Sequence, residues 1–150
     1  MAELRKRRSD RGAMQGGVGM LSYYPPRISE WILASIQTEK DYPELSEAFG
    51  EMAVLEAEQF RVLGGGMLRK GMNPPLRSLL LAGRGGCASL SAAEGRELAR
   101  FLRRMREQTE QMGEELAFLL SLPEWEGEPW GEQLRRNHEK QLRRLGQMLS

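Results

Sequence analysis

The sequence predicts an all-α fold in which four helices form a bundle. Three observations lead to this prediction. Apolar residues recur every three or four positions over long stretches, which is the spacing of one buried helix face. Two stretches carry Asp or Ser followed three residues later by Glu, a pattern that caps the start of a helix. The segments between these stretches do not require a strand.

The first 20 residues are expected to form a flexible tail. They combine a basic cluster with several glycines, a composition that buries too little apolar surface to offset the entropy of ordering. The residues concerned are Arg5, Lys6, Arg7, Arg8, Gly12, Gly16, Gly17 and Gly19. A chain of 150 residues is the size of one ordinary domain. We therefore assign residues 21–150 to the bundle.

The first hairpin is expected to begin at two prolines. Pro25 and Pro26 suit a helix entry, because proline presets the backbone and its missing N–H is not needed in the first turn. The first helix then spans residues 27–39. Asp41 caps the second helix and Glu44 completes its capping box.

The second helix contains a run of glycines at residues 64–66. Each glycine costs about 1 kcal/mol relative to alanine inside a helix. We expect a kink or fraying at this point. Gly71 and the sequence at 73–75 then end the helix.

The second hairpin is expected to follow a long crossover, residues 76–90. A capping box from Ser91 to Glu94 starts the third helix, which runs to Pro123. An acidic loop, residues 124–131, leads to the fourth helix, which reaches the C-terminus. Two helical hairpins joined by a crossover make a four-helix bundle.

Polar residues interrupt the apolar stripes at matching places. Glu56 and Gln59 lie three apart on the buried face of the second helix, and His138 and Gln141 repeat this arrangement on the fourth. Gln108 fills a gap in the stripe of the third helix. The spacing predicts that all of these side chains point into the core.

At these residues the chain resembles the ferritin-like superfamily, in particular the rubrerythrin-like and manganese-catalase-like bundle proteins of bacteria. The resemblance covers about residues 22–149. It is carried by Ser29-Glu30, by Tyr42-Pro43-Glu44-Leu45 and by Glu56-Ala57-Glu58-Gln59-Phe60. It implies a ferritin-like four-helix bundle with a di-iron or di-manganese centre and chemistry on peroxide or dioxygen.

The metal-binding positions that the resemblance implies are degenerate in this sequence. The family has Glu on helices one and three and Glu-x-x-His on helices two and four. The corresponding residues here are Glu30, Glu56, Gln59, Gln108, His138 and Gln141, with Glu39 as an alternative to Glu30. A Gln carbonyl brings no charge and binds such metals weakly, so a normal dinuclear centre is not expected.

Three interpretations of these polar residues stay open. They can form a structural hydrogen-bond network in which Glu56 pairs with His138. They can hold one zinc, iron or manganese ion through Glu30, Glu56 and His138. Full di-metal redox chemistry is the third interpretation. No catalytic residue is assigned.

Composition excludes several other classes of function. The formal net charge of +1 gives no reason to expect a nucleic-acid partner, and no apolar run approaches the ~20 residues that span a bilayer. Cys87 is the only cysteine, so an internal disulfide is impossible. The glycine runs lack the Lys-Ser/Thr ending of a phosphate loop. We expect the cytoplasm as the location.

Three functions follow. The chain is a ferritin-like bundle that has lost its metals and acts as a structural or interaction module, with homodimerisation through an apolar face as one expectation. Alternatively, it is a metal-binding oxidoreductase. In the third, its basic tail and the cationic side of the fourth helix bind an acidic partner. The cations of that helix are Arg135, Arg136, Lys140, Arg143 and Arg144.

Overall fold

The computed structural model of the chain describes residues 2–82 and 95–149, and these residues form helices without any strand. The helices are α1 (Ala2–Thr38), α2 (Pro43–Arg69), α3 (Leu76–Ala82), α4 (Gly95–Leu120) and α5 (Pro129–Leu149), with a short 3-10 helix, η1 (Pro123–Trp125), before α5. The all-α prediction is therefore confirmed for this part of the chain. None of these helices combines the length and apolar character needed to cross a membrane.

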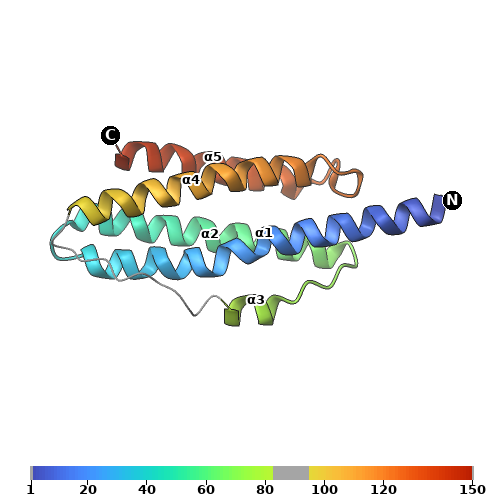
Figure 1. The fold of residues 1–150 in the computed structure, drawn as a ribbon, viewed down its shortest axis with the longest axis horizontal. Helices are drawn as coiled ribbons and strands as arrows, with labels where there is room; N and C mark the ends of the chain where they lie inside the picture. Colours follow the sequence, from blue (N-terminus) through green and yellow to red (C-terminus); the bar gives the residue numbers. More distant parts are fainter. Residues whose placement is uncertain (1, 83–94, 150) are drawn as a thin grey trace.

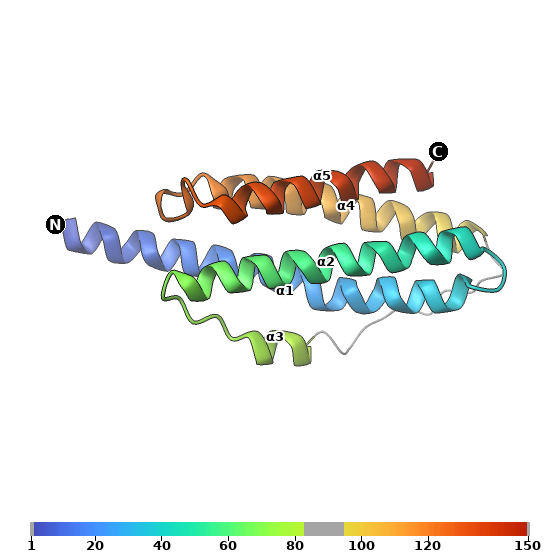
Figure 2. The same ribbon diagram turned by 180° about the vertical axis from the view of Figure 1, so that it is seen from behind.

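The four long helices lie side by side in two hairpins, α1 with α2 and α4 with α5 (Figure 1). Helices α2 and α4 run in the same direction in Figure 1. Figure 2 shows the short α3 outside the bundle, beside the α1–α2 hairpin. The second capping box and Cys87 lie at residues 83–94, outside the described residues.

The apolar core is divided into two clusters. One contains Met20, Leu63, Met112 and Trp130, among others, and the other contains Trp31, Phe49, Met52 and Met105. The predicted stripes of α2, α4 and α5 supply most of these side chains, because residues three and four apart share one helix face. Polar residues lie between the two clusters along the bundle, and they form the layer described below.

Helix α1 differs most from expectation. It continues through Pro25 and Pro26 and begins at Ala2, so the expected helix start at residue 27 is wrong. Residues 12–20, expected in a flexible tail, are helical as well, and Ala13 and Met20 lie in the core. Burial against α2, α4 and η1 offsets the local cost of proline and glycine in this helix.

Two glycines of α1 mark close approaches between helices. A Cβ at Gly17 would lie 2.7 Å from the sulfur of Met67, and a Cβ at Gly16 would lie 3.0 Å from Leu119. Glycine therefore lets α1 pack closely on α2 and α4 at these positions. The same residues that suggest flexibility in the sequence fit the packing of the folded bundle.

The glycine run in α2 likewise belongs to a continuous helix. Gly64 and Gly66 are buried, and the indole of Trp130 lies against Gly66. The expected acidic loop is also ordered differently: α5 begins at Pro129, and Trp125 packs edge-to-face on Trp130 with ring centroids 4.9 Å apart. These contacts tie the α4–α5 connection to the end of α2.

Candidate functional site

A layer of buried polar side chains separates the two apolar clusters. Its most buried members are Arg27, Glu56, Gln59, Thr109, His138 and Gln141, each at most 5% exposed. They come from α1, α2, α4 and α5, so every long helix contributes. The prediction that Glu56, Gln59, His138 and Gln141 point inward is confirmed, while Gln108 is half-buried.

Arg27 lies at the centre of this layer, although it was not among the site residues predicted from the sequence. Its Nε donates to Glu56 Oε1 at 2.5 Å, and its Nη1 donates to Gln108 Oε1 at 2.8 Å. Its Nη2 donates to Thr109 Oγ1 at 2.5 Å, and Nη1 also reaches the carbonyl of Met105 at 3.3 Å. One guanidinium thus joins α1 to α2 and α4, with several donors held in one plane.

The position of Arg27 on α1 explains why it is buried. It lies three residues after Tyr24 and four before Trp31, and all three residues face the core. This spacing is that of a helix stripe. Because the first helix was expected to start at residue 27, Arg27 was not placed on that stripe. A helix drawn through the prolines would have shown it.

Glu56 receives hydrogen bonds on both carboxylate oxygens. Arg27 donates to Oε1, and the indole N–H of Trp31 donates to Oε2. Burial raises the pKa of Glu56 above its ordinary value, while the Arg27 charge and the two hydrogen bonds act in the opposite direction. The expected pairing of Glu56 with His138 is therefore replaced by pairing with Arg27 and Trp31, which lie on the neighbouring helix.

A second chain of hydrogen bonds crosses the layer from α1 to α5. The hydroxyl of Tyr24 donates to Gln59 Oε1 at 3.1 Å, and Gln59 Nε2 donates to Gln141 Oε1 at 2.7 Å. Burial raises the pKa of Tyr24, and the Glu56 charge adds to this shift, so the phenol stays protonated as a donor. Gln59 of α2 and Gln141 of α5 thus bind each other in the core.

His138 lies in the layer, and neither of its ring nitrogens has a hydrogen-bond partner among the residues that the structure describes. Its Nε2 would lie 2.5 Å from a Cβ at residue 113, so the imidazole packs against Gly113 of α4. Burial lowers the pKa of His138, and the Arg27 charge lowers it further, whereas Glu139 acts in the opposite direction. The imidazole is therefore neutral at pH 7.

Glu30 and Glu39, the two alternative metal-ligand positions of the first predicted helix, lie outside the buried polar layer. Glu30 is half-buried and accepts a hydrogen bond from Arg104 of α4 at 3.2 Å. Glu39 is exposed in the turn that follows α1. Among the residues that the structure describes, no group of three or more His, Cys, Asp or Glu side chains is placed to hold a metal ion. Glu30, Glu56 and His138 form no such group.

The single histidine leads to a prediction about pH. The unfolded chain protonates His138 near its ordinary pKa of about 6.5, whereas the folded chain protonates it only at lower pH. The unfolded state then binds more protons in this range, so the free energy of unfolding falls as pH drops below about 6.5. The loss is at most about 1.4 kcal/mol per pH unit.

Guanidinium denaturation at pH 5.5 and 7.5 checks this prediction. The variant His138→Leu should show a smaller loss of stability at the lower pH than the unchanged chain, and comparing the two removes the contribution of the carboxylates. Because the chain has one histidine, NMR titration reads its pKa directly. A pKa at or above 6.5 in the folded chain would contradict the burial argument.

Searches with protein-family models, among curated proteins and among solved structures find no match to this chain.

Proposed function

We propose that this chain is a ferritin-like bundle in which an internal ion pair has replaced the metal centre, and that it acts as a structural or interaction module. The observation that carries the proposal is the position of Arg27. Its guanidinium binds Glu56 and Gln108, two of the side chains at the positions where the family binds its metals. The positively charged side chain of Arg27 thus takes the place of a bound metal ion.

The charge of the layer supports the same proposal. Two divalent cations need several carboxylates to neutralise them. Among the described residues that are fully buried, Glu56 is the only carboxylate, and Arg27 already neutralises it. Bringing a metal ion to Glu56 would require the guanidinium to leave a site where it makes hydrogen bonds to α2 and α4.

The hydrogen bonds among other members of the layer also fit a structural role. Gln59 accepts from Tyr24 and donates to Gln141, and Thr109 accepts from Arg27 while it donates to the Met105 carbonyl at 2.6 Å. Satisfied polar groups inside a core fix which helices pack together and in which register. The residues here therefore do not fit a dinuclear centre, and no reaction step is assigned to them.

Elemental analysis by mass spectrometry tests the proposal. The chain is purified without chelators or a metal-affinity tag after growth with iron, manganese and zinc. We expect clearly substoichiometric metal. We also expect no change in unfolding when Mn²⁺, Fe²⁺ or Zn²⁺ is added, whereas a native site at 100 times its Kd would stabilise the chain by about 2.7 kcal/mol.

The metal-dependent oxidoreductase is the outcome that would overturn this proposal. It requires near-stoichiometric metal that is lost in Glu56→Gln and in His138→Gln. The exposed Glu107 provides the control, because Glu107→Ala should leave any such metal in place.

A further inference from the structure

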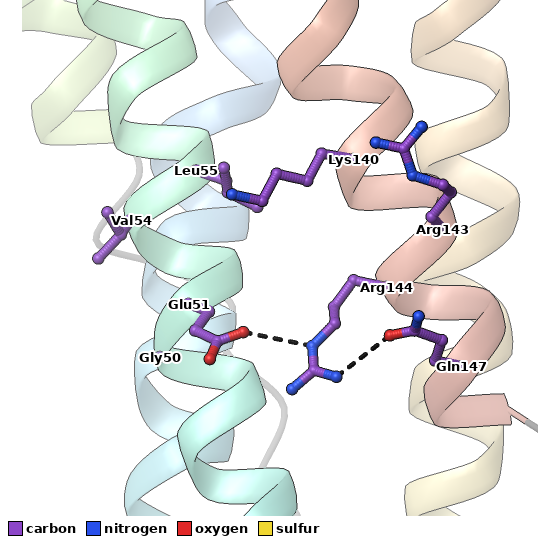
Figure 3. Close-up of a pocket in the computed structure, with 8 residues that line it drawn as sticks. All are labelled: Gly50, Glu51, Val54, Leu55, Lys140, Arg143, Arg144 and Gln147. Atoms are coloured by element: carbon purple, nitrogen blue, oxygen red, sulfur yellow. Dashed lines mark hydrogen bonds and ion pairs between the residues drawn. The ribbon is translucent and has the colours of Figure 1, made fainter.

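A groove of about 570 Å³ lies on the surface between α2 and α5. Gly50, Val54 and Leu55 of α2 line one side, and Lys140, Arg143 and Arg144 line the other (Figure 3). The lining thus combines apolar side chains with a row of cations. It is separate from the buried layer, whose side chains point into the core.

The charges of the groove are only partly neutralised. Arg144 is held between Glu51 of α2 and Gln147 of α5, each at 3.2 Å. Lys140 and Arg143 make no ion pair with the residues that the structure describes. Lys140 extends across the groove toward Leu55, as Figure 3 shows. The groove therefore offers positive charge beside an apolar surface.

The apolar surface continues beyond the groove onto α1. A second depression of about 320 Å³ shares Gly50 and Val54 with it and is lined on the α1 side by Ile28, Ile32 and Ile36. Val54 is 70% exposed and Ile36 is 64% exposed. On the α2 side, small residues line this second depression beside Val54, namely Gly50, Ala53 and Ala57. A contiguous apolar strip of this kind usually marks an interaction surface.

We propose that the groove between α2 and α5 binds an acidic amphipathic helix of another protein. The apolar face of such a helix would cover Val54 and Leu55, and its carboxylates would face Lys140 and Arg143. This inference rests on the proposed function as an interaction module and names its partner. A second copy of the chain fits less well, because a symmetric pair brings the same surface, and so the same cations, together.

Fluorescence anisotropy with a labelled synthetic peptide tests this assignment on the full chain. The probe is an 18-residue amphipathic helix with Leu at positions i, i+3, i+4 and i+7 and Glu on both sides of that stripe. A second peptide carries Lys in place of each Glu. We expect the Glu peptide to bind at least about tenfold more tightly, and its affinity to fall as salt rises.

Variants locate the site. Val54→Glu and the double variant Lys140→Glu with Arg143→Glu should each weaken binding at least about tenfold. Phe118 of α4 is exposed to the same 70% as Val54, so Phe118→Glu is the matched apolar control. Arg103→Glu with Arg106→Glu, also on α4, matches the double change in charge. Both controls should change affinity less than about twofold.

Metal content is measured on the same preparation, so that a failure of the groove assignment can be distinguished from a failure of the proposed function. Failure of a metal-free chain to bind the Glu peptide, or equal loss in the control variants, overturns the groove assignment alone. Concentration-dependent dimerisation that Val54→Glu abolishes overturns it in favour of a second copy. Stoichiometric metal overturns the proposed function and with it the basis of this inference.

Discussion

Replacing Arg27 with leucine is expected to lower the free energy of unfolding by about 3–5 kcal/mol, the range for breaking a buried ion pair. The side chains of Arg27 and Glu56 are 2% and 0% exposed. Removing the guanidinium leaves the Glu56 carboxylate with the Trp31 indole but without a counter-charge. Hydrogen-bond acceptors on Gln108 and Thr109 lose their donor as well. Urea or guanidinium denaturation measures the loss.

The double variant Arg27→Leu with Glu56→Leu should recover much of that loss. Removing both charges together avoids an uncompensated buried ion, and part of the loss remains because leucine is shorter than arginine and fills less of the layer. A double-variant cycle with the two single variants then gives the coupling energy between Arg27 and Glu56. Little coupling would contradict the central place of this pair.

Arg104 provides the matched control for Arg27. It also pairs with a glutamate, Glu30, but its own side chain is 50% exposed. Water screens such a pair, so Arg104→Leu should cost no more than about 1 kcal/mol. A loss at Arg104 as large as that at Arg27 would mean that burial does not decide the effect.

Adjacent glycines of α2 should respond to alanine with opposite signs. A Cβ at Gly66 would lie 2.6 Å from the indole of Trp130, a rigid ring packed on Trp125. Gly66→Ala should therefore cost about 1–3 kcal/mol through overpacking. At Gly65 the nearest atom is the end of the flexible Arg69 side chain, at 3.4 Å. Gly65→Ala should stabilise the helix by up to about 1 kcal/mol.

Guanidinium denaturation of both variants, with Trp fluorescence as the readout, checks this pair. Because the two substitutions add the same methyl group to the same helix, their difference reports the contact with Trp130. A Gly66→Ala variant as stable as Gly65→Ala would show that the indole does not pack against α2 at this point.

The sequence by itself determined the helical class and the direction in which most side chains point. Met52, Met105 and Leu134 follow the three- and four-residue spacing of the apolar stripes in the sequence, and they are buried. The same rule placed Glu56, Gln59, His138 and Gln141 inside. These predictions succeeded because the side of a helix on which a residue lies depends only on the local spacing of 3.6 residues per turn.

Only the tertiary structure decided how far α1 extends. Proline costs about 3 kcal/mol and glycine about 1 kcal/mol inside a helix, so local propensity places the start of the first helix at Pro25 and Pro26 instead of at Ala2. Burial of Leu21, Tyr24 and residues earlier in α1 offsets these costs. The free energy of this burial cannot be read from the local sequence. Arg27 lies in the polar layer for the same reason, because its place on the buried stripe of α1 depends on the extension of that helix through the prolines.

Tertiary structure also decided which buried polar groups bind each other. Residue spacing predicted that Glu56 and His138 both lie in the core. In the structure Glu56 accepts hydrogen bonds from Arg27 and Trp31 and not from the expected partner, His138. Which hydrogen-bond partner a buried polar group has depends on differences of a few tenths of an ångström in the distances between helices, because hydrogen bonds form only near 3 Å. Residue spacing within one helix does not contain those distances, whereas the packing of the hairpins sets them.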